Sequence, residues 1–237
     1  MNGVLPLYKE RGMTSFDCIR RLRQLLHTKK IGHSGTLDPN VSGVLPICIG
    51  NATKLVPYLM ESGKVYAGEL LIGEATTTED LDGEVVATKE VSSPISESQI
   101  QLAMSELTGN ITQIPPMYSA VKVNGRRLYE YARAGKEVER PHRQVSIYDF
   151  RRTSSLTFKD DCCYFDFEVA CSKGTYIRTL SVDLGKSLGY SSHMSFLERQ
   201  ASAGLQLDDA LTLAEIAEKC QVDDWSFLLP IEYGVMD

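Results

Sequence analysis

The sequence lacks any apolar run long enough to cross a membrane as a helix, which takes roughly 20 residues. Its longest useful apolar run is VLPICI, and the opening MNGVLPLYKE has no basic start followed by a long apolar stretch. No signal peptide is therefore expected. These absences predict a cytoplasmic protein with no membrane partner.

Cysteine and histidine are too scattered to indicate a disulfide framework or a metal site. The six cysteines include no C-x-x-C pair, and the four histidines show no ligand-like spacing. A chain of 237 residues is also long enough to bury a hydrophobic core that is stable without disulfide bonds. We expect reduced thiols, no structural zinc and no other metal.

Positive charge is scarce in total but concentrated locally. The formal net charge is −6, which argues weakly against a nucleic-acid-binding protein. Yet residues 18–33 carry five cations and no acid, residues 113–143 carry seven cations and three acids, and residues 206–237 carry eight acids and one lysine. The two basic segments could form a surface for a polyanion, and the alternative is that they are ordinary solvated faces.

Apolar periodicity and cap residues predict strands and helices that intermix without a repeat or a long linker. Strands are expected at GVLPLY, KVYAGELLIG, RQVSIYDF and CYFDFEVAC, and a loop at EATTTEDLDGE. Helices are expected after the cap residues Thr14 or Ser15 and Asn51, and from Ser96 to Leu107. Two further helices are expected over TYIRTLSVDLGKSLG and ALTLAEIAEKC. A tight turn is expected at Asn124-Gly125. Because no regular βαβ rhythm emerges, the predicted fold class is α+β with a mostly antiparallel sheet.

The stretch HSGTLDP gathers glycine, proline and polar residues where no regular element is expected. A phosphate loop would need Gly-Lys-Ser/Thr, and the carboxylate of Asp38 would repel a phosphate. A metal site would need more ligands than His33 and Asp38. Asp before Pro is an ordinary turn, but Gly35, Pro39 and Gly43 also suit a rigid, exposed loop that presents a catalytic carboxylate.

Five motifs, in order over residues 3–200, resemble those of the TruB family of tRNA pseudouridine synthases. They are GVLPLYKERGMTSFDCIRRLR, GHSGTLDPNVSGVLPICIGNATKLVPYL, KVYAGELLIGEATTTEDLDGEV, QIPPMYSAVKVNGRRLYEYARAG and CSKGTYIRTLSVDLGKSLG. The resemblance implies a pseudouridine synthase fold: a mixed, mostly antiparallel curved sheet flanked by helices, with a central RNA-binding cleft. It implies a catalytic domain over residues 1–205, an RNA-clamping insertion near 113–143, and a short acidic helical extension over 206–237.

The resemblance also implies a role for each matched residue. Asp38 is the catalytic aspartate, Arg178 pairs with it, Tyr66 packs against the target base and Tyr176 supports the site. His33 helps to dislodge and hold the RNA loop. The other implied RNA contacts are Lys9, Lys122, Arg126, Arg127, Arg133 and Arg143.

Two residues depart from the family pattern. Glu10 stands where the family commonly has proline, which puts the shape of the local loop in question. Glu198 stands in a run that is usually more basic in the family. Neither departure touches the residues to which the resemblance gives a chemical role.

The implied reaction isomerises one uridine, position 55 in the T loop of tRNA, to pseudouridine on a flipped-out base, with no cofactor. The partner is the T stem-loop, and a monomer is expected. One ionised carboxylate can act as nucleophile or base, and a neighbouring guanidinium favours its ionised form. Two rival functions are a non-catalytic RNA-binding protein and a glycoside hydrolase, which usually needs a second carboxylate.

Overall fold

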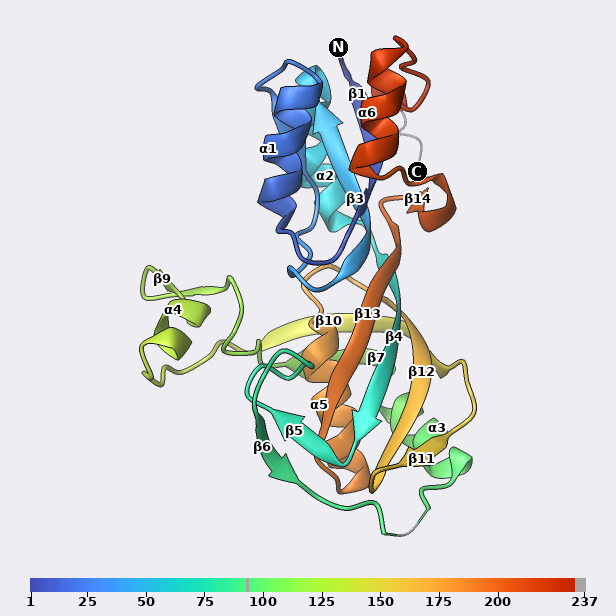
Figure 1. Ribbon diagram of the computed structural model, residues 1–237. Coiled ribbons are helices and arrows are strands. Elements are labelled where there is room, and N and C mark those ends of the chain that lie inside the picture. Colours follow the sequence, from blue (N-terminus) through green and yellow to red (C-terminus); the bar gives the residue numbers. More distant parts are fainter. Residues whose placement is uncertain (93, 233–237) are drawn as a thin grey trace. The chain divides into compact units, whose positions relative to one another are not determined.

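A computed structural model describes residues 1–92 and 94–232 of the chain. The chain forms two compact units, of which the first holds residues 1–66 and the chain from Glu198 onward and the second holds residues 67–197. Strands β4 (Lys64–Ile72) and β13 (Ser192–Ser202) contribute residues to both units (Figure 1). Residues 206–232, which the sequence predicted as a short acidic helical extension, lie within the first unit.

The elements of the first unit, in chain order and apart from β4 and β13, are β1 (Gly3–Lys9), α1 (Ser15–Leu25), β2 (Ile31–His33), β3 (Ser42–Ile49), the 3₁₀ helix η1 (Gly50–Leu55), α2 (Val56–Glu61), β14 (Leu205–Gln206), the 3₁₀ helix η2 (Leu207–Asp209) and α6 (Leu213–Gln221). Strand β3 is central and buried along its whole length. It pairs antiparallel with β1 and β2 and parallel with β13. A strand with neighbours on its edges and layers on both faces has no exposed side, which explains its continuous apolar run.

Helices cover both faces of this sheet. On one face, Leu22 of α1 and Ile216 of α6 pack against Leu45 and other alternate residues of the strands. On the other face, Leu55 and Leu59 of the η1–α2 segment pack against the intervening strand residues. The alternation follows from the two-residue period of a strand. Helix α6, predicted as part of an acidic extension, therefore contributes to the core of the first unit.

The elements of the second unit, apart from β4 and β13, are β5 (Glu74–Thr76), β6 (Val85–Thr88), α3 (Glu97–Glu106), β7 (Gly109–Gln113), β8 (Lys122–Val123), β9 (Arg126–Arg127), α4 (Leu128–Arg133), β10 (Arg143–Arg152), β11 (Thr157–Lys159), β12 (Cys162–Cys171) and α5 (Ile177–Leu188). Strand β10 pairs antiparallel with β7 and β12, and β12 is followed by β4 and β13 in the strand order. Helix α3 packs against β10 and α5. Phe150 and Phe167 meet edge to face in the core, with ring centroids 5.7 Å apart. This arrangement confirms the predicted α+β class with its mostly antiparallel sheet and flanking helices.

The predicted helix boundaries are confirmed at several caps. The side chain of Thr14 accepts from the backbone N–H of Asp17 at the start of α1, and Ser96 caps α3 in the same way. Helix α5 ends at Gly189 in the left-handed conformation. The segment after Asn51 differs from the prediction, because it is a 3₁₀ helix before it becomes α2. Within the described residues, no helix is long and apolar enough to cross a membrane.

The Asn124-Gly125 turn is confirmed as the tip of a β8–β9 hairpin. Both residues have positive φ, 50° and 81°, which is what a tight two-residue hairpin turn requires. Leu128 is fully buried and its N–H donates to the carbonyl of Val121 at 2.8 Å, so the hairpin has its own anchor. Residues 122–143 are called the hairpin segment below.

Candidate active site and RNA interface

Asp38 lies on the loop between β2 and β3, in the first unit, and its side chain is exposed. The N–H of Leu37 donates to the hydroxyl of Ser15 at 3.0 Å, and that hydroxyl lies 3.3 Å from the carbonyl of Leu37. On the other side of Asp38, the carbonyl of Pro39 accepts from the N–H of Gly12 at 2.9 Å. The loop of residues 34–41, called the Asp38 loop below, is therefore fastened on both sides of its carboxylate.

Lys9 fastens the Asp38 loop from within the protein. Its side chain is completely buried, and its ammonium donates to the carbonyls of Val41 at 2.7 Å, Glu10 at 3.0 Å and Pro39 at 3.1 Å. An ammonium has three N–H donors, so these acceptors use all of them. Burial lowers the pKa of Lys9. This geometry corrects the expectation of an RNA contact, because a buried ammonium that holds three carbonyls presents nothing to a phosphate.

Arg199, which the sequence did not single out, holds the same loop from β13. It is 1% exposed, its Nε donates to the carbonyl of Val44 at 2.7 Å, and its Nη2 donates to the carbonyl of Gly35 at 2.9 Å. One planar guanidinium thus joins the two ends of the segment that contains Asp38. The available signal was an arginine in an otherwise half-apolar strand sequence, which is too weak to identify a buried residue.

The glycines around Asp38 are explained by Arg199. A side chain at Gly35 would place its Cβ 3.2 Å from Nη1 of Arg199, and one at Gly43 would place it 2.3 Å from the carbonyl oxygen of Arg199. Both glycines also have positive φ, 74° and 115°. These glycines therefore allow strand β13 to approach the loop closely. The sequence predicted instead that they allow a substrate to approach.

His33 ends β2 and is only partly exposed. Its Nδ1 atom is buried and has no hydrogen-bond partner among the described residues. Burial, with a smaller effect from the positive charge of Arg199, lowers the pKa of His33. The imidazole therefore favours its neutral form, in which it can exchange a hydrogen bond or stack on a base but adds no positive charge.

The departure at Glu198 has a structural explanation. Its Oε1 accepts from the hydroxyls of Tyr8 and Ser42, each at 2.9 Å, and its Oε2 accepts from the amide of Gln200 at 3.1 Å. The carboxylate therefore joins β1, β3 and β13 within the first unit.

Tyr66, on β4, is 9% exposed, so only an edge of its side chain reaches solvent.

Arg178 lies in the second unit, in the first turn of α5, and is buried. Its Nη1 donates to the carbonyl of Thr78 at 3.0 Å, its Nη2 donates to the carbonyl of Tyr118 at 2.9 Å, and Nη1 lies 3.6 Å from Oδ2 of Asp80. The loop that contains Thr78 and Asp80 and the chain at Tyr118, both in the second unit, thereby orient one guanidinium. Asp38 belongs to the first unit, so the pairing of Arg178 with Asp38 stays a prediction.

Tyr176 immediately precedes α5 and is held through its backbone. Its N–H donates to Oε1 of Gln113 at 3.0 Å, and its carbonyl accepts from Nε2 of the same amide at 3.2 Å. Gln113 is 1% exposed at the end of β7. A single buried amide therefore fixes the backbone from which both Tyr176 and Arg178 project.

The loop before β6 brings two acidic residues to Arg178 and α5. Burial raises the pKa of Asp80, opposed by its hydrogen bond from Thr78 and by the charge of Arg178. Burial also raises the pKa of Glu79, which accepts from the hydroxyl of Thr179 at 3.2 Å. Among the described residues, no group of three or more His, Cys, Asp or Glu is placed to hold a metal ion.

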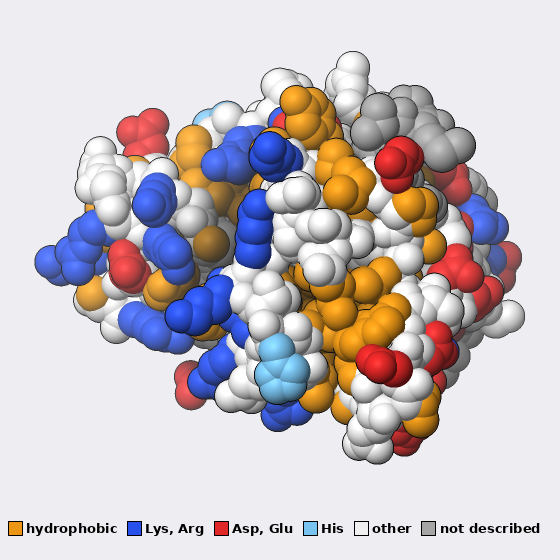
Figure 2. Space-filling view, turned by 90° about the horizontal axis from the view of Figure 1, so that it is seen from above, with side chains coloured by type: hydrophobic (Ala, Val, Ile, Leu, Met, Phe, Trp, Pro, Cys, Tyr) orange, Lys and Arg blue, Asp and Glu red, His pale blue; other side chains and the backbone are white. Residues whose placement is uncertain are grey.

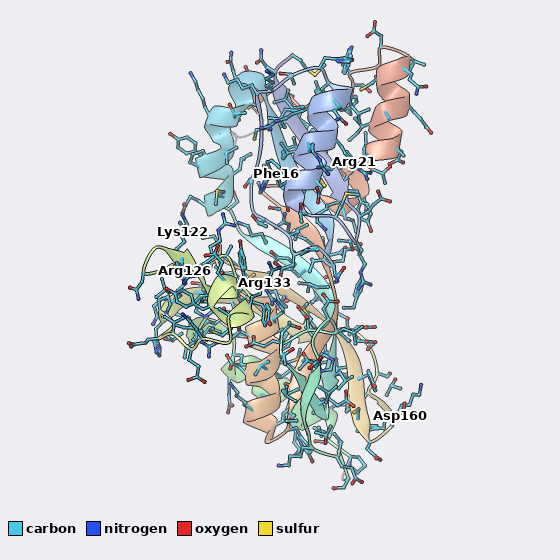
Figure 3. All side chains as sticks on the ribbon, turned by 60° about the vertical axis from the view of Figure 1, so that its left-hand side comes forward. Phe16, Arg21, Lys122, Arg126, Arg133 and Asp160 are labelled. Carbon is cyan, nitrogen blue, oxygen red and sulfur yellow. The ribbon has the colours of Figure 1, made fainter. Side chains whose placement is uncertain are left out.

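The hairpin segment presents its cations to solvent, as the sequence predicted. Its exposed cations include Lys122, Arg126, Arg127, Arg133 and Arg143, of which three are labelled in Figure 3. Tyrosine rings order several of them: Arg127 and Arg133 lie over Tyr129 at 5.8 and 5.3 Å, and Arg126 lies over Tyr131 at 5.6 Å. Guanidinium groups held on rings lose less conformational entropy when they bind a phosphate.

Comparison with known proteins shows the family of the chain. Residues 23–177, more than half of the chain, match the TruB family pseudouridylate synthase (N terminal domain). The protein is therefore a pseudouridine synthase, an isomerase. The chain belongs to the TruB family, as its motifs indicated.

Its relatives include proteins called tRNA pseudouridine synthase B. The one from Streptococcus mutans serotype c is 63% identical over 237 residues, which cover all of this chain and 81% of the relative. The one from Streptococcus sanguinis is 61% identical with the same coverage. Among solved structures, a chain of a Cbf5-Nop10-Gar1 complex has a TM-score of 0.75 and 28% identity. That match covers 98% of this chain but only 61% of the other chain, so this chain spans about three fifths of its length.

Proposed function

We propose that this protein isomerises a uridine of tRNA to pseudouridine, that the target is uridine 55 in the T loop, and that Asp38 is the catalytic carboxylate. The observation that carries the proposal is an exposed carboxylate on a loop fastened by Ser15, Lys9 and Arg199, in a chain 63% identical to a tRNA pseudouridine synthase B. A fixed carboxylate can be presented to one atom of a substrate, which a mobile one cannot.

The chemistry needs no atom from outside the substrate. The bond from the sugar C1′ to N1 of uracil breaks, the base turns, and C5 bonds to the same C1′. The proton leaves C5, and N1 becomes protonated. Asp38 can serve as a nucleophile at the sugar or the base, or as a base at the sugar. Each role needs the ionised form, and contact with water at an exposed position stabilises a charged group.

Arg178 is proposed to face Asp38 when RNA is bound. Its guanidinium is already oriented by the carbonyls of Thr78 and Tyr118 and by Asp80. A cation beside Asp38 stabilises the ionised carboxylate. A planar guanidinium can also hold the carboxylate in one orientation through two parallel hydrogen bonds. The preorganisation of Arg178 supports this role, since little reordering is needed when the substrate arrives.

The aromatic residues are proposed to receive the target base. A base must leave its stack before its C5 and N1 atoms can be reached, and aromatic side chains offer it a replacement surface. Tyr66 provides that surface, and Tyr176, fixed through Gln113, supports it. His33, favoured in its neutral form, helps to hold the displaced RNA loop.

The hairpin segment is proposed to bind the phosphates of the T stem-loop. Its cations are exposed and several are ordered by Tyr129 and Tyr131. Such contacts position an RNA without reading its sequence, which fits recognition by the shape of a folded stem-loop. One protein chain and one tRNA then form the working complex, so the protein is expected to act as a monomer.

The test is to map pseudouridine in tRNA transcripts and in a short T stem-loop after incubation with the protein. We expect pseudouridine at position 55 and release of tritium from uridine labelled at C5. Asp38→Asn should abolish both while leaving RNA binding largely intact. Asp160→Asn, which alters a carboxylate that is 75% exposed, is the matched control and should remain active.

Two results would favour the rival functions. Release of free uracil would identify a hydrolase, because the sugar would then have been transferred to water and not back to the base. RNA binding by the wild-type protein with neither product would identify a non-catalytic RNA-binding protein. Turnover by Asp38→Asn within tenfold of wild type would remove Asp38 from the mechanism.

A further inference from the structure

Helix α1 has an exposed face that the proposed active site leaves unused. Its apolar face buries Cys18, Ile19 and Leu22 in the core of the first unit. On the outside, Phe16, Arg20, Arg23 and His27 follow one another at four, three and four residues, and all four are exposed. That spacing places Phe16, Arg20 and Arg23 on one side of a helix with 3.6 residues per turn. His27 lies beyond the end of α1 at Leu25 and has a positive φ of 46°. The three residues on the helix, Phe16, Arg20 and Arg23, are called the α1 stripe below.

Phe16 is the unusual member of the α1 stripe, because its side chain is 63% exposed. A single exposed aromatic residue is common on protein surfaces and would not indicate a binding site by itself. Here it stands at the head of a row of cations on the same helix. An aromatic ring beside arginines is the arrangement that binds nucleic-acid strands, in which bases stack and phosphates pair with cations.

The surroundings of the α1 stripe are positive although the whole chain is negative. Residues 18–33 carry five cations and no acid in a chain whose net charge is −6. The one acid of the helix, Asp17, is used by the cap: Oδ2 accepts from the hydroxyl of Thr14 at 2.6 Å, and Oδ1 lies 3.0 Å from Arg20. The face shown in Figure 2 carries Lys and Arg side chains as well as Asp and Glu side chains.

The α1 stripe begins beside the Asp38 loop, within the same unit. Ser15, the residue before Phe16, shares hydrogen bonds with both the N–H and the carbonyl of Leu37. From Phe16 to Arg23 the stripe runs along the helix for about 10 Å, at about 1.5 Å per residue. Figure 3 shows Phe16 and Arg21 on this helix. An RNA strand whose base reaches Asp38 therefore has its neighbouring nucleotides within reach of the stripe.

We propose that the α1 stripe is a second RNA-binding surface, in which Phe16 stacks a nucleobase and Arg20 and Arg23 bind phosphates of the same strand. The proposal rests on the proposed function, because it takes tRNA as the ligand. It is distinct from the hairpin segment, which belongs to the other unit and meets the RNA through a different element. The stripe adds affinity and orientation to a site whose chemistry is performed by the Asp38 loop.

The first experiment measures how tRNA affinity depends on salt. Arg20→Ala with Arg23→Ala should weaken binding and lower the slope of log affinity against log salt by about 1.4 to 1.8, the value for two lost phosphate contacts on single-stranded or helical nucleic acid. The matched control removes Lys159 and Lys186, which are 72% and 70% exposed and lie near acids. The control should leave the slope near its wild-type value.

The second experiment detects the stacked base directly. The chain has one tryptophan, Trp225, which packs against Phe227 with ring centroids 6.0 Å apart. Trp225→Phe with Phe16→Trp places a single fluorescent reporter on the stripe, and tRNA should quench it on binding. The control carries Trp225→Phe with Tyr148→Trp, because Tyr148 is 62% exposed, close to the value of Phe16, but lies on β10.

Two outcomes would overturn the proposal. An unchanged salt slope in the double arginine variant would mean that these arginines touch no phosphate. Quenching that is equal at positions 16 and 148, or absent at position 16, would mean that no base stacks on the stripe. Pseudouridine formation by the wild-type protein is measured on the same tRNA: if it occurs while the stripe variants bind normally, only the stripe is refuted, and if it fails, the proposed function fails independently.

Discussion

The guanidinium of Arg178 lies 3.6 Å from the carboxylate of Asp80, and both side chains are largely buried, with 7% and 16% of their surfaces exposed. The pair belongs to one unit and joins the start of α5 to the loop before β6. Asp80 thus provides Arg178 with a fixed acidic partner before any substrate arrives. The arrangement explains how a residue proposed to meet Asp38 can be held ready by other parts of the chain.

Arg178→Lys should slow single-turnover isomerisation at saturating RNA by at least about tenfold, the equivalent of one lost charge-assisted hydrogen bond. Lysine keeps the charge but cannot reach Thr78, Tyr118 and Asp80 as one planar group. RNA affinity should change much less than the rate. Arg151→Lys, at an arginine that is 56% exposed and paired with Glu168, is the control and should keep its rate. A normal rate in Arg178→Lys would reduce this residue to a source of charge.

Glu79→Gln should change how the free energy of unfolding depends on pH. Because burial raises the pKa of Glu79 in the folded protein, the folded state binds the proton more tightly than the unfolded state. The resulting stabilisation is full below the ordinary pKa of 4.5 and is lost as the pH rises through the higher folded pKa. Urea unfolding between about pH 5 and pH 8 should show the variant gaining stability relative to wild type as the pH rises. The exposed Glu84→Gln should show no such gain, and equal behaviour of the two variants would contradict the prediction.

Arg199→Lys should loosen the Asp38 loop. A lysine ammonium in place of the guanidinium cannot serve the carbonyls of Gly35 and Val44 together, so one buried carbonyl loses its partner at a cost of about 1 to 3 kcal/mol. Hydrogen exchange at the amides of Ser34 and Val41 should accelerate, and the single-turnover rate should fall more than RNA affinity. Arg152→Lys, in the second unit, is the matched control. If stability falls but exchange in the loop and the rate do not respond, Arg199 serves the core and not the site.

Lys9→Met separates a role beneath the loop from a role in RNA binding. Because the ammonium is buried on three carbonyls, its loss should reduce the rate of isomerisation and leave the salt dependence of RNA binding unchanged. The carbonyls of Pro39 and Val41 lose a partner, which costs about 1 to 3 kcal/mol of stability. A salt slope lowered by about 0.7 to 0.9 would instead restore Lys9 as a phosphate contact.

Arg126→Ala with Arg127→Ala should weaken RNA binding through the hairpin segment. Two lost phosphate contacts lower the salt slope by about 1.4 to 1.8, and the rate at saturating RNA should stay close to that of wild type because both residues are proposed to contribute affinity and not chemistry. The Lys159 and Lys186 variant again serves as the control. A collapse of the saturated rate with binding intact would mean that the hairpin segment positions the base.

Local signals in the sequence were sufficient for the caps at Thr14 and Ser96, the Asn124-Gly125 hairpin and the end of α5 at Gly189. Each is decided by a few neighbouring residues whose backbone preferences or side-chain hydrogen bonds act within one turn. The same holds for the presence of a carboxylate on an irregular loop at Asp38, and the order of the motifs indicated the family.

The tertiary structure alone decided what holds that loop. Arg199 and Gly35 are separated by 164 positions, and Lys9 and Val41 by 32, so no local pattern could pair them. Strands β13 and β3 were not predicted. The residue types in these strands are set by packing against neighbouring strands and show no clear apolar period in the sequence. A charged residue reads from sequence as a surface residue, yet Lys9 and Arg199 are buried because backbone carbonyls of the Asp38 loop satisfy their donors. The sequence indicated the residue that is proposed to carry the chemistry, and long-range packing determined which residues hold its loop in place.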